Sequence, residues 1–141
     1  MALIRYTASA DNTITNAYQS NLQTRATGAN TGEADVMEIF SIYGRQTPTS
    51  SLSPASTELS RLLIQFPIST LSADRAAGNL PNSGSVEFFL KLYNTPHSRT
   101  VPKNYKLTVA AISQSWQEGN GLDLTNYLDV VRKNSGSNWI Q

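Results

Sequence analysis

The chain contains no cysteine among its 141 residues and only one histidine, His97. Without cysteine, disulfide bonds and thiolate metal sites are both excluded. A lone histidine cannot form the histidine cluster that usually holds zinc, so we expect neither a metal nor a cofactor. Because His97 lies in a loop flanked by proline residues, we expect its imidazole to be solvated rather than catalytic.

Charge is also scarce, since only 15% of the residues are charged and the formal net charge is +1. No block of like charge marks a surface for nucleic acid or for an anionic membrane. No apolar run approaches the ~20 residues that span a bilayer, and the first residues lack the apolar core of a signal peptide. We therefore expect no nucleic-acid partner, no membrane insertion, and synthesis in the cytoplasm of the producing cell.

The strongest pattern that the sequence does contain is an alternation of apolar residues between Ser60 and Pro67. In an extended backbone this spacing puts Leu62, Ile64 and Phe66 on one side. Pro67 has no N–H to offer a neighbouring strand, so it ends the run. The segment is predicted to be a central strand, which needs a second layer to cover its apolar face.

Two further segments alternate as strongly, residues 85–93 and residues 105–111. The first places Val86, Phe88, Leu90 and Leu92 on one face, with Glu87, Phe89, Lys91 and Tyr93 on the other. We predict that both segments are strands in the same buried layers as the central strand. Weaker strand patterns occur in residues 3–7 and 11–15, which suit a sheet edge, and in residues 34–43, where Met37 and Ile39 are predicted to point inward.

The segments between these strands are rich in Ser, Thr, Asn, Gly and Pro, as turns require. One or two helical turns are predicted from Ser69 to Arg75, ended by Gly78, and residues 123–133 fit a short helix or a strand about equally well. The long connection of residues 44–58 is an interaction loop or a crossing between sheets. The fold class predicted is all-β, an antiparallel jelly-roll-like sandwich with at most one or two short helices, in a single domain of residues 1–141.

No catalytic motif of a known kind is present. The sequence has no Gly-x-Ser-x-Gly elbow, no phosphate-binding loop and no dinucleotide fingerprint. Carboxylates are the remaining candidates, and they gather in two groups, the first being Glu33, Asp35 and Glu38, and the second Glu118, Asp123 and Asp129. Such groups can cleave a glycoside or hold calcium, but solvated loop surfaces explain them better, and we predict no enzymatic activity.

Aromatic side chains are the best candidates for ligand contact. Trp116, Trp139 and Tyr127 are the residues that could stack on a sugar ring. Trp116 directly follows a predicted strand, which favours a place in the core or at the rim of the sandwich. For Trp139 the core and the surface are equally compatible with the sequence.

Four short motifs together resemble the DNRLRE-type domain. They are Asp11-Asn-Thr-Ile, Arg61-Leu-Leu-Ile-Gln-Phe, Val86…Leu90-Lys-Leu-Tyr, and Ser115-Trp-Gln-Glu-Gly. The segments Gly121-Leu-Asp-Leu-Thr-Asn-Tyr-Leu-Asp and Ser137-Asn-Trp-Ile-Gln are similar to forms found in structural proteins of marine phages. The resemblance covers the whole chain, although each motif is short and degenerate.

This resemblance implies a β-sandwich of jelly-roll type that acts as an adhesive or packing module without catalysis. Family members usually continue with further strands after the Trp-x-Glu segment, whereas this sequence ends at Gln141. The sandwich is therefore expected to be incomplete at its C-terminus. Either the chain is the ordered part of a longer protein, or a neighbouring chain supplies the missing strands.

Three functions stay open at this point. The leading one is a non-enzymatic virion protein (a capsid decoration, neck, tail or fibre module) whose partners are other virion proteins in an oligomeric assembly. The second is a carbohydrate-binding module that attaches to surface glycans of the host. The third, and the weakest, is a fragment that cleaves glycans with Glu118 and Asp123.

Overall fold

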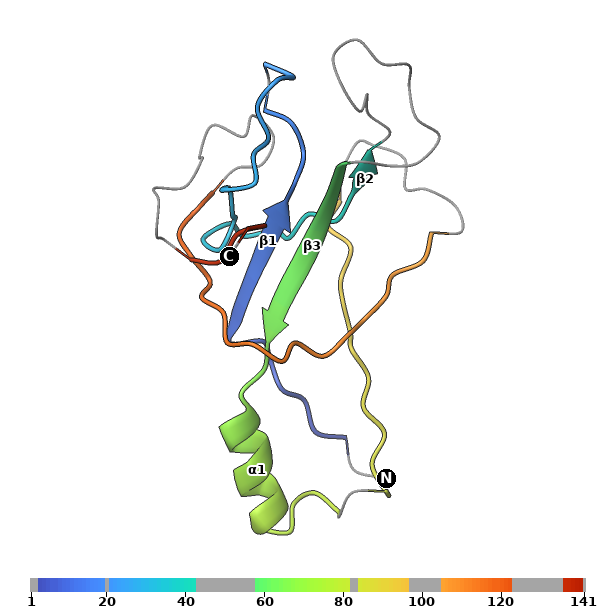
Figure 1. The fold of residues 1–141 in the computed structure, drawn as a ribbon. Helices are drawn as coiled ribbons and strands as arrows, with labels where there is room; N and C mark the ends of the chain where they lie inside the picture. Colours follow the sequence, from blue (N-terminus) through green and yellow to red (C-terminus); the bar gives the residue numbers. More distant parts are fainter. Residues whose placement is uncertain are drawn as a thin grey trace. The chain divides into compact units, whose positions relative to one another are not determined.

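A computed structural model describes residues 3–19, 21–42, 58–81, 84–96, 105–122 and 136–140. Four elements lie in these ranges: β1 (Ala10–Thr15), β2 (Ser41–Ile42), β3 (Glu58–Gln65) and α1 (Ile68–Ala76). Figure 1 shows the two longer strands side by side. The chain divides into two compact units, Met1–Ile68 with Trp116–Gln141, and Ser69–Ser115. The single domain predicted over residues 1–141 stays a prediction.

The sheet of the first unit has the order β1-β3-β2, with both pairs antiparallel. Its register runs from Ala10 opposite Gln65 to Thr15 opposite Ser60. The prediction that the Ser60–Pro67 segment is a central strand is confirmed, because β3 is paired on both of its edges. β3 ends at Gln65, two residues before Pro67, as expected for a residue that cannot donate to a ladder. β1 lies at the sheet edge, as predicted from its β-branched residues.

The interior of this unit is made of small and polar side chains rather than large apolar ones. The buried apolar residues among those described are Ile14, Ala17, Ala26 and Ala29. Phe40 packs against two of the alanines. The largest fully buried side chains are Asn12, Asn30, Thr13 and Thr15. Buried amides and hydroxyls are stable only when they are hydrogen-bonded, so this core depends on its polar contacts.

One predicted inward residue is wrong. Ile39 is 43% exposed, whereas the neighbouring Phe40 reaches the core. The reason is the pairing with β3, since the Phe40 N–H donates to Ser60 Oγ at 2.7 Å and the Phe40 carbonyl accepts from the Ser60 N–H at 3.1 Å. These two bonds turn Phe40 toward the core in place of Ile39, so the inward-facing residues are shifted by one position from those that the hydropathy pattern indicates.

α1 confirms the prediction of a short helix after β3. It spans nine residues, buries none of them, and is followed by Gly78 with φ +78°. A left-handed residue just after a helix ends it, and glycine adopts that conformation without steric cost. This helix is too short to cross a membrane, and no other described residues form one that could.

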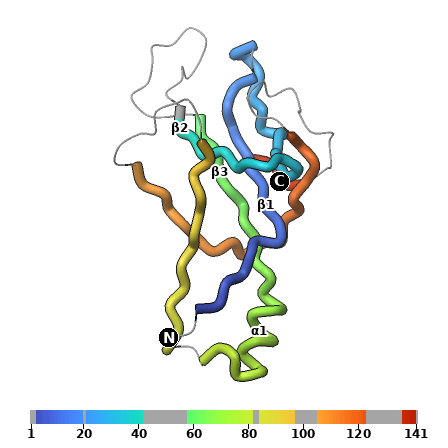
Figure 2. The backbone as a smooth tube through the Cα atoms, turned by 180° about the vertical axis from the view of Figure 1, so that it is seen from behind, coloured from blue at the N-terminus to red at the C-terminus, as the bar shows by residue number. Residues whose placement is uncertain are grey.

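The predicted strands at residues 85–93 and 105–111 are not formed. The structure assigns no strand in residues 84–96 or 105–122, and Figure 2 shows both as extended tubes. Most of their large side chains are exposed, with Phe89 at 80% and Val109 at 75%. An alternating pattern forms a strand only when it pairs with a neighbouring strand, and neither segment is paired with a described strand. The predicted buried layer is therefore absent from these residues.

Candidate functional site

Two buried asparagines join three distant parts of the first unit. We call Asn12, Asn30 and the backbone groups that they bind the asparagine junction. The Asn12 side-chain oxygen accepts from the Thr31 N–H at 3.0 Å, and its nitrogen donates to the Ser137 carbonyl at 3.0 Å. Asn30 accepts from the Gly121 N–H at 3.0 Å through its side-chain oxygen. Both amides thus replace water for backbone groups that a missing strand partner would leave unsatisfied.

Backbone hydrogen bonds extend the junction on both sides. The Glu33 N–H donates to the Gly121 carbonyl at 3.0 Å, and the Ser137 N–H donates to the Gln117 carbonyl at 2.8 Å. The Gln117 N–H in turn donates to Ser137 Oγ at 3.1 Å. The segments 116–122 and 136–140 are therefore held by direct bonds to the loop that follows β1 and to each other.

Glycine makes this close approach possible. A Cβ added at Gly121 would overlap the backbone carbonyl of Asn30, and one at Gly136 would overlap the backbone of Gly119. Gly119 and Gly136 also have φ values of +85° and +89°, a region that other residues rarely adopt. The Gly119-Asn-Gly121 motif, which the sequence offers as a simple chain break, is in fact a contact point between backbones.

A carboxylate pair lies at the start of β1. The backbone N–H of Asp11 donates to Glu118 Oε1 at 2.8 Å. Partial burial raises the pKa of the Asp11 carboxyl above its usual 3.8, and the nearby negative charge of Glu118 raises it further. Glu118 therefore acts here as a hydrogen-bond acceptor for the main chain. Its predicted companions Asp123 and Asp129 lie outside the described residues.

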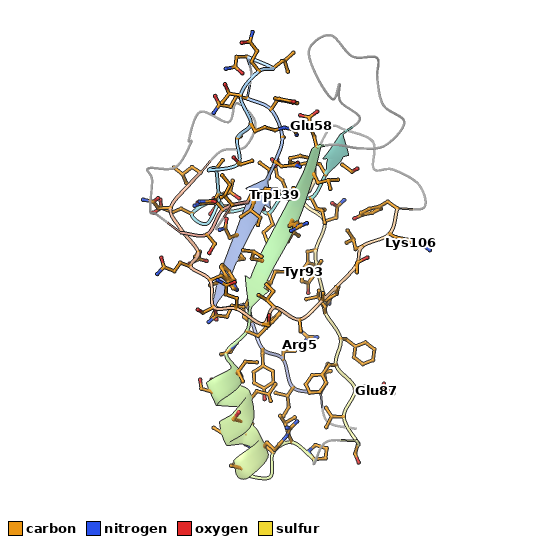
Figure 3. All side chains as sticks on the ribbon, in the orientation of Figure 1. Arg5, Glu58, Glu87, Tyr93, Lys106 and Trp139 are labelled. Atoms are coloured by element: carbon orange, nitrogen blue, oxygen red, sulfur yellow. The ribbon has the colours of Figure 1, made fainter. Side chains whose placement is uncertain are left out.

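Trp139 lies over the sheet of β1 and β3, as Figure 3 shows. The guanidinium carbon of Arg61 is 4.3 Å from the centre of its ring. The Trp139 backbone N–H donates to the Thr27 carbonyl at 3.0 Å. The ring is half-buried, and the cation occupies the face on which a sugar would stack. A ligand on that face would have to displace Arg61.

The other residues proposed for ligand, catalytic or metal sites do not form a common site among the described residues. Trp116 is half-buried, as a rim position predicts, and Tyr127 lies outside the described residues, as does His97. Glu33, Asp35 and Glu38 are all exposed. Within the described ranges, no three acidic or histidine side chains are close enough to hold a metal ion.

Reasoning from the sequence missed the residues that organise this region. Asn12 and Asn30 were not singled out, although Asn12 belongs to the Asp11-Asn-Thr-Ile motif. Arg61 is predicted only as part of its strand and motif, without a contact to Trp139. For Asn12 and Arg61 a signal is present, because a polar residue within a family-like motif needs a hydrogen-bonding or stacking role, whereas Asn30 lies outside every motif.

Comparisons of the chain with protein-family models, with curated proteins and with solved structures find no match. The chemistry of the region must therefore be argued from its own geometry. Its amides and backbone groups bind each other, its best-placed tryptophan stacks on an arginine, and Glu118 accepts a main-chain hydrogen bond. These contacts connect chain segments, which is the role of a structural joint.

We expect the substitution Asn12→Ala to lower the free energy of unfolding by about 2–4 kcal/mol. It leaves the Thr31 N–H and the Ser137 carbonyl without partners, and each unsatisfied buried group costs about 1–3 kcal/mol. Urea denaturation followed by tryptophan fluorescence measures the loss. Asn21→Ala is the matched control, because Asn21 also accepts backbone N–H bonds but is exposed. Equal losses in the two variants would contradict a special role for Asn12.

The raised pKa of Asp11 predicts a specific pH dependence. A carboxyl with a higher pKa in the folded state favours folding when it is protonated, and this contribution is lost as pH rises through the folded pKa. Asp11→Asn should therefore be more stable than wild type at neutral pH, and the difference should shrink as pH falls through the raised pKa of the folded state and be smallest below 3.8. Denaturant midpoints from pH 3 to pH 7 test this, with Glu33→Gln as an exposed control of equal charge change. A difference that grows on acidification would refute the assignment.

The Arg61–Trp139 contact should contribute about 0.5–1 kcal/mol to stability, the range of a cation–π pair near solvent. Arg61→Met keeps the apolar stem and removes the cation, while Arg5→Met does the same at an exposed arginine elsewhere in the unit. A double-mutant cycle of Arg61→Met with Trp139→Leu isolates the pair. We expect a coupling energy in that range, and a coupling of zero would show that the two side chains do not interact in solution.

Proposed function

We propose that this chain is a non-enzymatic structural or accessory protein of a virion, with a β-sandwich fold of the DNRLRE type. It acts by packing against other virion proteins. The proposal begins from the resemblance in the sequence and takes its main support from one observation about the asparagine junction.

That observation is the meeting of three resemblance motifs at one place. Asp11 and Asn12 of the first motif pair with Ile64 and Leu63 of the second. Glu118 of the fourth motif accepts the Asp11 N–H. Motifs that lie far apart in the sequence, 107 residues apart for Asp11 and Glu118, thus bind each other directly. This is what a genuine family signature predicts, because co-occurring short motifs are expected to share a structural task.

The C-terminal segment that is similar to forms in phage structural proteins also contacts the asparagine junction. Its Ser137 carbonyl accepts from Asn12, and its Trp139 stacks under Arg61 of the second motif. This placement supports the part of the proposal that concerns virions, because the segment that resembles phage structural proteins contacts β1 and β3 directly.

Exposed apolar side chains favour packing over solution chemistry. Large apolar residues remain exposed in the second unit, with Phe88 at 67%, Phe89 at 80% and Tyr93 at 78%. Large exposed apolar side chains of this kind are suited to a protein–protein contact. A virion module would cover such residues in the assembled particle, with polar groups of the loops at the rim of the interface.

Quantitative mass spectrometry of density-gradient-purified particles tests the proposal. Particles are collected from a culture that produces the chain and washed in high salt, and their protein content is compared with that of the cleared lysate. We expect the chain to co-sediment with particles at a fixed ratio to the major capsid protein. An abundant host enzyme serves as the control for trapped material. Recovery of the chain only in the soluble lysate would overturn the proposal.

A further inference from the structure

In the segment Ser85–Tyr93, large side chains are exposed and the backbone makes no backbone–backbone hydrogen bond within the described residues. Its large side chains are exposed, including Phe89 at 80%, Leu90 at 43% and Leu92 at 45%. Within the described residues, no backbone–backbone hydrogen bond involves this segment. An extended chain with exposed apolar side chains, whose backbone groups make no such bond to the described residues, is a template for strand addition.

The backbone of the segment is already extended (Figure 2). Lys91 Nζ lies 4.8 Å from the centre of the Tyr93 ring, as is expected when residues two apart share a side of an extended chain. This is the face on which the sequence places Glu87, Phe89, Lys91 and Tyr93. Figure 3 shows Glu87 and Tyr93 on this extended segment. A partner strand would therefore need little rearrangement of the backbone.

The sequence of the segment complements itself. If two copies run antiparallel with Phe89 opposite Phe89, Glu87 of each copy faces Lys91 of the other. In the same register Phe88 faces Leu90, and Val86 faces Leu92. Opposite charges, aromatic pairs and apolar pairs directly across two strands are all stabilising. A two-fold axis generates each of these contacts twice.

We propose that Ser85–Tyr93 pairs antiparallel with the same segment of a second copy of this chain, across a two-fold axis at Phe89. The pairing deepens the proposed packing function, on which it rests for its biological setting, by naming the first partner. Two edges become one continuous ladder, and Phe89 meets its equivalent at the centre.

Charge disfavours two of the competing registers. Centring the pair on Glu87 places two carboxylates opposite each other, and centring it on Lys91 places two ammonium groups opposite each other. Like charges directly across a strand pair are destabilising. The other exposed extended segment, residues 105–111, has no such complement, because Lys106 would face Ala110 about its own centre. Charge therefore favours this segment over residues 105–111, and the Phe89-centred register is the one that sets Glu87 opposite Lys91.

Sedimentation velocity of the full chain, from about 1 to 200 μM, is the primary test. Pairing of one strand buries less surface than the ~1,200 Å² of a standard stable interface, so we expect a reversible dimer with a dissociation constant in the micromolar range. The charge reversals Glu87→Lys and Lys91→Glu should each weaken it about tenfold or more at low salt, since two attractive pairs become repulsive. Glu33→Lys and Lys106→Glu carry the same charge changes at exposed positions outside the segment and should leave it unchanged.

Rescue distinguishes the pairing from a loss of folding. The double variant with both reversals restores opposite charges and should dimerise within about threefold of wild type. An equimolar mixture of the two single variants should form a heterodimer, because one then presents two lysines at these positions and the other two glutamates. Neither recovery is possible if the reversals simply unfold the chain.

The lack of native cysteine allows a direct check of the axis. Phe89→Cys places a thiol opposite itself, and mild oxidation should give a covalent dimer faster than Val109→Cys does, which is exposed in the other segment. A monomer at 200 μM, or amide protection of residues 85–93 that does not vary with concentration, would overturn the proposal in favour of pairing within one chain. A monomer that still co-sediments with particles rejects only this pairing. A dimer absent from particles rejects only the virion role.

Discussion

The first unit depends on hydrogen bonds from two buried side-chain amides. Asn12 and Asn30 are fully buried, and each binds a backbone group of a segment about a hundred residues away. The apolar residues buried around them are mostly alanines, whose burial stabilises little because so little surface leaves water. Each amide bond contributes modestly in itself, but a buried backbone group left without a partner is costly. The interior is therefore specified by polar matching more than by apolar volume.

This polar matching explains why glycines stand where the segments cross. Gly121 lets the backbone of its segment reach the Asn30 carbonyl region without a clash, and Gly119 passes beside the Asn30 side chain. An amide can bridge two backbones only when they approach within the length of one short side chain. The glycines thus allow the close approach of the two backbones, and the asparagines supply the hydrogen bonds between them. Their spacing in the sequence has no period, so no helical or strand pattern reveals it.

The sequence predicts the elements whose signals are local. The alternation that ends at Pro67 indicates β3, and Gly78 indicates the end of α1, because each signal acts within a few residues of its cause. The errors involve partners that are distant in the chain. Phe40 replaces Ile39 in the core because of a bond to Ser60, and Arg61 covers Trp139 across a separation of 78 residues. Of the candidate site, Trp139 and Glu118 were named in advance, but their partners Arg61 and the Asp11 backbone could not be inferred from spacing.

The distribution of side chains is the reverse of that in most small monomers. Small polar residues fill the described interior of the first unit, while the largest aromatic side chains of the second unit face solvent. The hydrophobic effect does not favour one apolar partner surface over another, because its free energy is proportional to the buried apolar area and has no direction. Selectivity must therefore come from groups that do have direction. In the segment Ser85–Tyr93 these are the backbone amides and the charges of Glu87 and Lys91, which face each other in one antiparallel register. Exposed apolar area supplies the driving force for association, and the two charges determine which partner and which register it stabilises.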